Sequence, residues 1–184
     1  MPEFGSGTGV VMEETSINRT KRLIWMFAII FILHNLEELI RMSEFLNAHV
    51  KEFPTFFQQA AGMWQGNSFS VAIWGLNGFA LLLAVLLTLN VQKRWVHILF
   101  TFLAGTMGIN AIMHIGQSIY LRNLAPGMVT AILLVLPVSI RSVIHEVKSG
   151  WVSKRLFVLL LGTGVITMPL IIWLIMLVTG WIVN

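Results

Sequence analysis

Residues 23–42 read LIWMFAIIFILHNLEELIRM, and this stretch decides the fold class. Its first half is entirely apolar, and its whole length is about the 20 residues that an α-helix needs to cross the hydrocarbon core of a bilayer. A secretory signal peptide would be followed by a small-residue cleavage site, and no such site follows this stretch. We therefore predict that this stretch is a retained transmembrane helix.

Four further stretches of similar character follow along the chain, and they are Phe69–Leu89, Trp95–Leu121, Gly127–Val147 and Leu156–Ile182. The 184 residues are 57% hydrophobic and only 11% charged, whereas a soluble domain is about 45–50% apolar. The mean hydropathy of +0.82 agrees with this. The sequence thus predicts an all-α protein, a polytopic membrane helix bundle of about five transmembrane helices.

The domain organisation expected from this pattern is simple. Residues 1–20 include a Gly-rich stretch without periodicity, and we expect them to form a disordered leader and a cytoplasmic N-terminal segment. Residues 21–184 are expected to form a single transmembrane domain. Between the first two spans, Ser43–Asn67 mixes aromatic with polar residues, which predicts either an interfacial amphipathic helix broken at Pro54 or an ordered loop outside the membrane.

The basic residues predict the orientation, because cytoplasmic loops retain Lys and Arg. With the N-terminus inside, eight of the twelve basic residues lie on the cytoplasmic flanks, and these are Arg19, Lys21, Arg22, Lys93, Arg94, Lys148, Lys154 and Arg155. Only Lys51 and Arg122 lie outside. We expect a cell-membrane protein with a cytoplasmic N-terminus and an external C-terminus. The basic residues therefore indicate topology, and no nucleic-acid partner is expected.

The first span carries an unusual set of ionisable residues. His34, Glu37 and Glu38 recur at i, i+3 and i+4, and Arg41 falls within the same arc, so all four share one helix face. Ionisable groups at this depth are costly and tend to face the protein interior. These side chains therefore need partners on other helices.

The third span offers such partners, because Asn110, His114 and Gln117 also share one face. Counting about 1.5 Å of rise per residue from the cytoplasmic side places both clusters in the outer half of the bilayer. We predict that His34 and His114 approach within about 8 Å, close enough to share an ion or a water. Asn77 of the second span arrives at a similar depth and is expected to join from the side.

Other polar residues are predicted to lie away from this site. Arg141, His145 and Glu146 fall towards the cytoplasmic end of the fourth span, roughly a membrane half-thickness from His114, and are excluded on that ground. His97 follows Lys93 and Arg94, and is expected at the interface. Small residues permit close helix approach, so Gly75 and Gly78 with Gly105 and Gly108 predict packing of the second span on the third.

His34-Asn35-Leu36-Glu37-Glu38 resembles the HxxEE motif that names a family of small, largely bacterial membrane proteins. That family is further marked by a second histidine, which His114 matches, and by a Tyr-x-Pro-Gly motif. Pro126-Gly127 matches the end of the latter motif, but Leu124 replaces its tyrosine, which puts any role of that hydroxyl in doubt here. The resemblance covers about residues 23–145. It implies a membrane protein but supplies no function.

Two interpretations of the polar residues compete. In the first, His34, Glu37, Glu38 and His114 form a His₂Glu-type site for a divalent metal, with zinc as the first candidate and iron as the second. In the second, Arg41 neutralises Glu37 or Glu38, while Asn110 and His114 form hydrogen bonds across helices. We favour the metal site, because intramembrane ionisable residues are functional by default. Thiolate sites are excluded, since the chain has no cysteine.

The expected function is that of a metal-dependent, hydrolase-like membrane enzyme acting on a lipid or another hydrophobic substrate. Whichever of Glu37 and Glu38 is not a ligand is expected to act as general base, with Arg41 and Asn110 orienting carboxylates or stabilising negative charge. One alternative is a proton- or cation-coupled transporter. Another is a structural partner protein whose polar cluster only fixes helix packing. The sequence leaves room for a homo-oligomer.

The orientation can be tested directly, because the chain contains no native cysteine. A cysteine placed after Asn184 should react with an impermeant maleimide added to intact cells. A cysteine at Lys93 should react only after the membrane is permeabilised, since this loop carries part of the cytoplasmic charge. The reverse labelling pattern would overturn the orientation and the depths that depend on it.

Overall fold

The structure is a computed structural model that describes residues 7–53, 55, 58, 61–64 and 66–183. Within these residues nearly all of the chain is helical and there is no β-strand. Five helices are long and apolar enough to cross a membrane. The prediction of an all-α bundle of about five membrane-spanning helices is therefore confirmed.

The helices follow one another with short connections. The long elements are α1 (Gly7–His49), α3 (Gly66–Leu89), α4 (Arg94–Leu121), α6 (Leu136–Lys148) and α7 (Lys154–Val183). Short elements complete the described chain: the 3₁₀ turns η1 (Val50–Glu52) and η2 (Ala61–Trp64), the single turn α5 (Met128–Thr130) and the π-helical turn η3 (Ala131–Val135). The turn α5, η3 and α6 together form the predicted fourth span.

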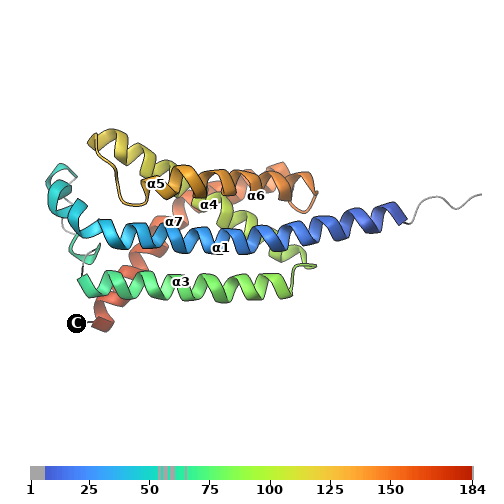
Figure 1. The fold of residues 1–184 in the computed structure, drawn as a ribbon, viewed down its shortest axis with the longest axis horizontal. Coiled ribbons are helices and arrows are strands. Elements are labelled where there is room, and N and C mark those ends of the chain that lie inside the picture. The colour runs from blue at the N-terminus through green and yellow to red at the C-terminus, as the bar shows by residue number, and fades with distance from the viewer. Residues whose placement is uncertain (1–6, 54, 56–57, 59–60, 65, 184) are drawn as a thin grey trace, which may run out of the picture.

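Helix α1 is much longer than the apolar stretch that it contains. It has 43 residues, about 65 Å of helix, and its N-terminal end projects beyond the bundle (Figure 1). Residues 7–20, for which we expected a disordered leader and a cytoplasmic N-terminal segment, form the first turns of this helix. No proline interrupts the chain between Gly7 and Phe53, so nothing in the sequence stops the helix at the membrane surface.

The segment after the first span is largely ordered against the bundle. Ser43–His49 forms the last turns of α1 and is followed by η1, whereas the break predicted at Pro54 lies outside the described residues. Phe45 and Leu46 pack with Ala61, Leu121 and Ala125 in one apolar cluster. This cluster ties the end of α1 to the end of α4.

The bundle is built around α1 and α4, which themselves touch only narrowly. Helix α1 packs against α3 on one side and against α6 on the other, while α4 packs against α6 and α7 (Figure 1). The apolar residues Ile30, Ala111, Ala131 and Val135 join α1, α4 and η3 in the middle of the bundle. The fourth span therefore lies between the two helices that carry the predicted site residues.

The glycines of α4 serve different contacts from those predicted. An added Cβ at Gly108 would lie 3.4 Å from Ser139 Cβ of α6, and one at Gly105 would lie 3.5 Å from Leu161 of α7. At Gly75 and Gly78 of α3 an added Cβ would meet nothing within 4 Å. These glycines therefore do not bring the second span against the third, and the two helices instead share an apolar cluster that contains Ala84, Leu87, Val96 and Phe100. Glycine spacing shows that a helix can be approached closely, but not by which neighbour.

Residues 131–135 interrupt the fourth span with a π-helical turn just before Pro137. Proline has no N–H, so it cannot donate to the carbonyl four residues earlier, and its ring disfavours regular helix there. A π turn absorbs this defect without ending the helix, and such turns are frequent at functional sites.

A buried polar cluster closes the end of the bundle that carries most of the basic residues. His97 is fully buried, with Nδ1 2.6 Å from Glu146 Oε2 and Nε2 donating to the Val91 carbonyl oxygen at 2.8 Å. The hydroxyl of Thr20 donates to Glu146 Oε1, and Trp151 stacks on the imidazole at 3.9 Å. Glu146 thus joins the imidazole of His97 to the hydroxyl of Thr20 in the core. His97 is therefore buried within the bundle, which its position beside Lys93 and Arg94 did not predict.

Removing one partner of this pair should destabilise the fold. Glu146→Gln should cost about 1–3 kcal/mol, because it leaves a buried hydrogen-bonding partner of His97 or Thr20 unsatisfied. Thermal unfolding in detergent, followed by circular dichroism, measures the effect. Glu44→Gln changes an exposed carboxylate on α1 and should leave the melting temperature unchanged. Equal melting temperatures for the two variants would contradict the pairing.

Candidate metal centre

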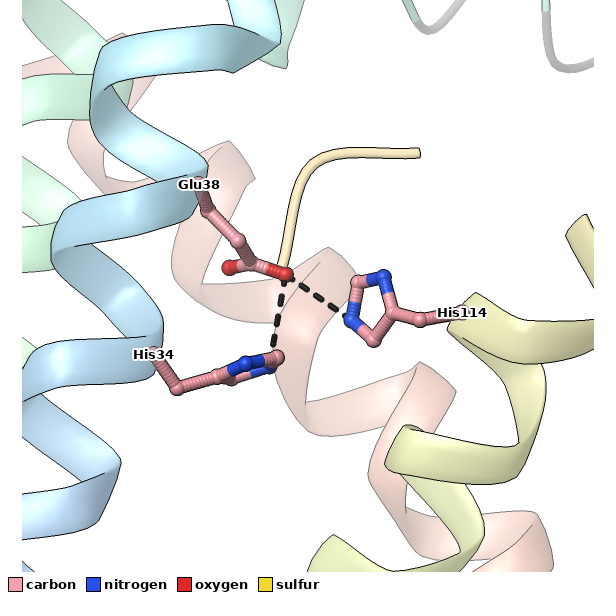
Figure 2. Close-up of side chains that lie close together, drawn as sticks. All are labelled: His34, Glu38 and His114. Carbon is pink, nitrogen blue, oxygen red and sulfur yellow. Dashed lines mark ion pairs between the residues drawn. The ribbon is translucent and has the colours of Figure 1, made fainter. Parts of the chain in front are cut away.

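Side chains of α1 and α4 meet near the end of the bundle that is remote from the His97 cluster. His34 and Glu38 of α1 lie one turn apart on the same face, and His114 of α4 faces them (Figure 2). The centroids of the two imidazole rings are 4.9 Å apart, at an interplanar angle of 80°. The predicted approach of His34 to His114 within about 8 Å is therefore confirmed.

The donor atoms of these three residues have the spacing of a metal-ligand set. Glu38 Oε1 lies 3.0 Å from His114 Nε2 and 3.7 Å from His34 Nε2. One nitrogen or oxygen from each residue lies within 4.8 Å of the others. Tetrahedral zinc with bonds of about 2.1 Å places its ligand atoms about 3.4 Å apart, between the two measured distances. Small side-chain shifts would therefore complete the coordination.

The hydrogen bonds of Asn110 indicate which nitrogen of each imidazole is an acceptor. Its amide Nδ2 lies 3.1 Å from His34 Nε2 and 3.2 Å from His114 Nε2. An amide nitrogen only donates hydrogen bonds, so in this network both Nε2 atoms accept and their lone pairs point into the site. The Glu38 carboxylate adds further lone pairs. Three electron-pair donors thus face one another, an arrangement that a cation among them would relieve.

A proton on His114 relieves only part of this opposition. His114 Nε2–H could donate to Glu38, but it could then no longer accept from Asn110. His114 Nδ1 is buried and has no hydrogen-bond partner among the described residues. The donor set and its geometry therefore fit a divalent metal.

Thr130 connects the second nitrogen of His34 to Glu37. His34 Nδ1–H donates to Thr130 Oγ1 at 2.9 Å, and the Thr130 hydroxyl donates to Glu37 Oε2 at 2.7 Å. Metal-binding histidines commonly donate their other N–H towards a carboxylate, which fixes the tautomer and the ring orientation. This chain of hydrogen bonds therefore leaves His34 Nε2 unprotonated and facing Glu38.

Glu37 itself lies outside the group of three donors. The backbone N–H groups of Val129 and Thr130 donate to its carboxylate at 3.2 Å and 2.8 Å. These N–H groups lie at the start of a helix, where they have no intrahelical partners and favour a negative charge. We predicted that both glutamates could bind the metal, but the structure separates them. Glu38 lies beside the histidines, whereas Glu37 accepts hydrogen bonds from the start of the fourth span.

Arg41 reaches Glu37 and the turn before α5. Its guanidinium lies 3.5 Å from Glu37 Oε1 and donates to the Leu124 carbonyl oxygen at 3.5 Å. The side chain of Arg41 is 37% exposed. The pairing of Arg41 with Glu37, expected in the structural interpretation, is thus present, and no contact with Glu38 is recorded among the described residues.

The turn that precedes α5 covers the three donors, and the sequence alone did not assign it this position. Gly127 has φ of 80°, and an added Cβ there would lie 2.6 Å from His34 Cε1 and 3.2 Å from His114 Cε1. Ser118 holds the turn down, since its hydroxyl accepts from the Ala125 N–H at 2.9 Å. The Pro126-Gly127 pair signals such a turn, but not what lies beneath it.

The remaining candidates take other places. Asn77 is buried and accepts from Asn35 Nδ2 at 2.7 Å, so it pairs with another face of α1 and does not join the histidines. Gln117 makes no hydrogen bond to the site within the described part of the chain. Depth alone cannot assign a partner, because α3 packs along α1 and brings Asn77 to Asn35, not to His34.

A protein-family model described as "Protein of unknown function with HXXEE motif" matches residues 25–142. The chain belongs to this HXXEE-motif family. No curated protein and no solved structure matches the chain. The matched range contains every residue of the candidate centre. In this HXXEE chain the histidine and the second glutamate of the motif face His114, whereas the first glutamate holds the backbone of α5.

The turn over the centre predicts a sharp effect of Gly127→Ala. A side chain at this position would meet two imidazoles. The turn also requires a left-handed backbone conformation at residue 127, which costs an L-residue about 1–2 kcal/mol. The variant should unfold at a lower temperature than the parent protein. Gly116→Ala on α4 is the matched control, since its Cβ would meet nothing within 4 Å. A Gly127→Ala protein as stable as this control would refute the close approach.

Proposed function

We propose that this protein is a membrane-embedded, metal-dependent hydrolase that acts on a lipid or another hydrophobic substrate. The observation that carries the proposal is the convergence of His34 Nε2, His114 Nε2 and Glu38 Oε1 inside the bundle. Two imidazoles and one carboxylate form the His₂Glu donor set of catalytic zinc sites, which keeps a fourth position for water or substrate. The same set also suits non-haem iron, which is the second candidate.

The depth of the centre favours a hydrophobic substrate. His34 is 1% exposed, whereas the Glu38 side chain is 15% exposed, so the centre is enclosed but not sealed. An apolar cluster of Ile30, Ala111, Ala131 and Val135 includes residues about one helical turn before each histidine. Beside it, Ile112 and Met113 of α4 are exposed on the apolar surface of the helix. A substrate dissolved in the bilayer would therefore reach the centre more readily than one dissolved in water.

Each step of the proposed hydrolysis can be assigned to a group at the centre. A bound metal would supply a Lewis acid and an activated water. Glu38 has a second oxygen, Oε2, that would take the proton from that water, whereas Glu37 is already occupied by Val129 and Thr130. Once a cation accepts the imidazole lone pairs, both N–H bonds of Asn110 are free to stabilise negative charge on the substrate. Arg41 acts at a distance, by fixing Glu37.

The hydrogen bonds of Asn110 to both histidines favour one competing function. In that function the cluster only fixes α1 against α4, and the protein is a structural partner in the membrane. A transporter would use the same ionisable groups to carry protons or cations. Metal content separates the structural function from the enzyme, and ion flux into proteoliposomes identifies the transporter.

Elemental analysis of purified protein tests the proposal. The parent protein should carry about one metal ion per chain, and His34→Ala, Glu38→Ala and His114→Ala should each abolish it. Glu37→Gln should weaken metal affinity by about 10–100-fold, because it disturbs only the hydrogen bonds that orient His34. His49→Ala changes a histidine of α1 outside the centre and should retain the metal.

The opposite outcome is equally clear. If the parent protein contains no metal when purified without chelators and takes up none on titration, the enzyme proposal fails. A structural network then predicts lower melting temperatures for the same alanine variants with no metal to lose.

A further inference from the structure

A cavity of about 340 Å³ lies between α1 and α6, at the end of the bundle opposite the candidate metal centre. Four of its lining residues are basic or imidazole side chains, namely Arg19, Arg141, His145 and Lys148. From Arg19 to His34 is about 22 Å along α1, so the cavity and the metal centre are separate sites. The cavity therefore takes no part in the hydrolase proposal.

The positive charge of this cavity is not neutralised by the protein. Among the described residues neither Arg19, Arg141 nor Lys148 forms an ion pair, although all three are exposed. The nearest carboxylate along α6, that of Glu146, is fully buried and accepts hydrogen bonds from Thr20 and His97. An anion is the missing partner.

The position of Arg141 makes this partner important. Arg141 lies seven residues before the end of α6, which is about 10 Å towards the bilayer interior. A guanidinium in a membrane-spanning segment costs about 2.5–3.5 kcal/mol at mid-membrane unless it is paired, and it is less costly nearer the interface. An anionic group that follows Arg141 to this depth has to belong to a molecule that itself enters the bilayer.

The remaining lining residues have the character of an acyl-chain groove. Pro137, Ile140 and Ile144 lie on the same face of α6 as Arg141 and Lys148, at the i, i+3, i+4, i+7 and i+11 spacing of one helix face. The apolar residues begin nearer the bilayer interior, and Lys148 is the last residue of the helix. The cavity thus runs from a basic end at the interface to an apolar end inside the membrane.

His145 is held at the side of the cavity by the core. Its Nε2–H donates to Thr20 Oγ1 at 3.2 Å and to the Ser16 carbonyl oxygen at 3.3 Å. These contacts join α1 to α6 behind the basic residues. The cavity therefore has a rigid wall, whereas a basic residue on an isolated helix would only reach out to passing headgroups.

We propose that this cavity binds one anionic phospholipid, with the phosphate between Arg19, Arg141 and Lys148 and an acyl chain along Pro137, Ile140 and Ile144. Arginine forms paired hydrogen bonds to phosphate oxygens, which gives such a site its selectivity for the headgroup. Basic pockets between membrane helices on the cytoplasmic side are suited to anionic lipids, and the charge distribution predicts that orientation here.

Native mass spectrometry of the full chain in detergent tests the proposal. Phosphatidylglycerol, titrated into delipidated protein, should give one retained lipid per chain, and phosphatidylcholine should be retained far less. Arg141→Gln should weaken phosphatidylglycerol retention by about fivefold, because one basic residue near an anionic headgroup contributes about that factor. Arg141→Lys keeps the charge but not the paired hydrogen bonds, and should restore only part of the retention. Circular dichroism checks that each variant is folded.

Arg155→Gln is the matched control, since Arg155 is an exposed basic residue near the same end of the bundle but does not line the cavity. It should bind phosphatidylglycerol like the parent protein. Equal losses for Arg141→Gln and Arg155→Gln would overturn the proposal, as would equal retention of phosphatidylcholine. Inorganic phosphate forms the last arm of the test. If it displaces the lipid at the concentration at which the lipid itself binds, the cavity is a site for free phosphate and the lipid proposal fails.

Discussion

The fold depends on one constraint, which is that a polar side chain inside a bilayer must find its partner within the protein. Helix α1 carries four polar residues within five positions in this situation, and three different parts of the bundle meet them. Asn35 meets Asn77 of α3, Glu37 meets the backbone of α5, and His34 and Glu38 meet α4. In lipid nothing replaces a lost partner, so these contacts fix where each helix stands around α1.

Much of this could be predicted from the sequence, because the decisive signals are local. Hydropathy located the spans, and helical periodicity with depth brought His34 to His114. The division between Glu37 and Glu38 could not be predicted, since adjacent residues differ by about 100° around the helix and only the neighbours decide which faces the histidines. The pairing of His97 with Glu146 was missed for the same reason, because residues 49 positions apart carry no mutual signal.

Among the described residues, the candidate metal centre has fewer hydrogen-bond donors than acceptors. Asn110 offers two N–H bonds to two imidazoles, and no donor remains for the Glu38 oxygen that faces both rings. A network built only for packing gains by satisfying each acceptor, since a half-satisfied buried network costs more than an apolar one. Here the N–H bonds of Asn110 instead meet both imidazole nitrogens, beside a carboxylate. This is a cost to stability that a bound cation would turn into binding energy.

The turn above the centre also explains why Leu124 is acceptable where the Tyr-x-Pro-Gly pattern has tyrosine. The side chain of Leu124 is 51% exposed, and this position contributes through its carbonyl oxygen, which accepts from Arg41. Arg41 and Glu37 therefore hold the turn by backbone atoms that any residue at position 124 provides. Gly127 differs, because its missing side chain is what lets the turn descend onto the imidazoles. The glycine of the motif is thus required by geometry, whereas the hydroxyl at its first position is not required to build the centre.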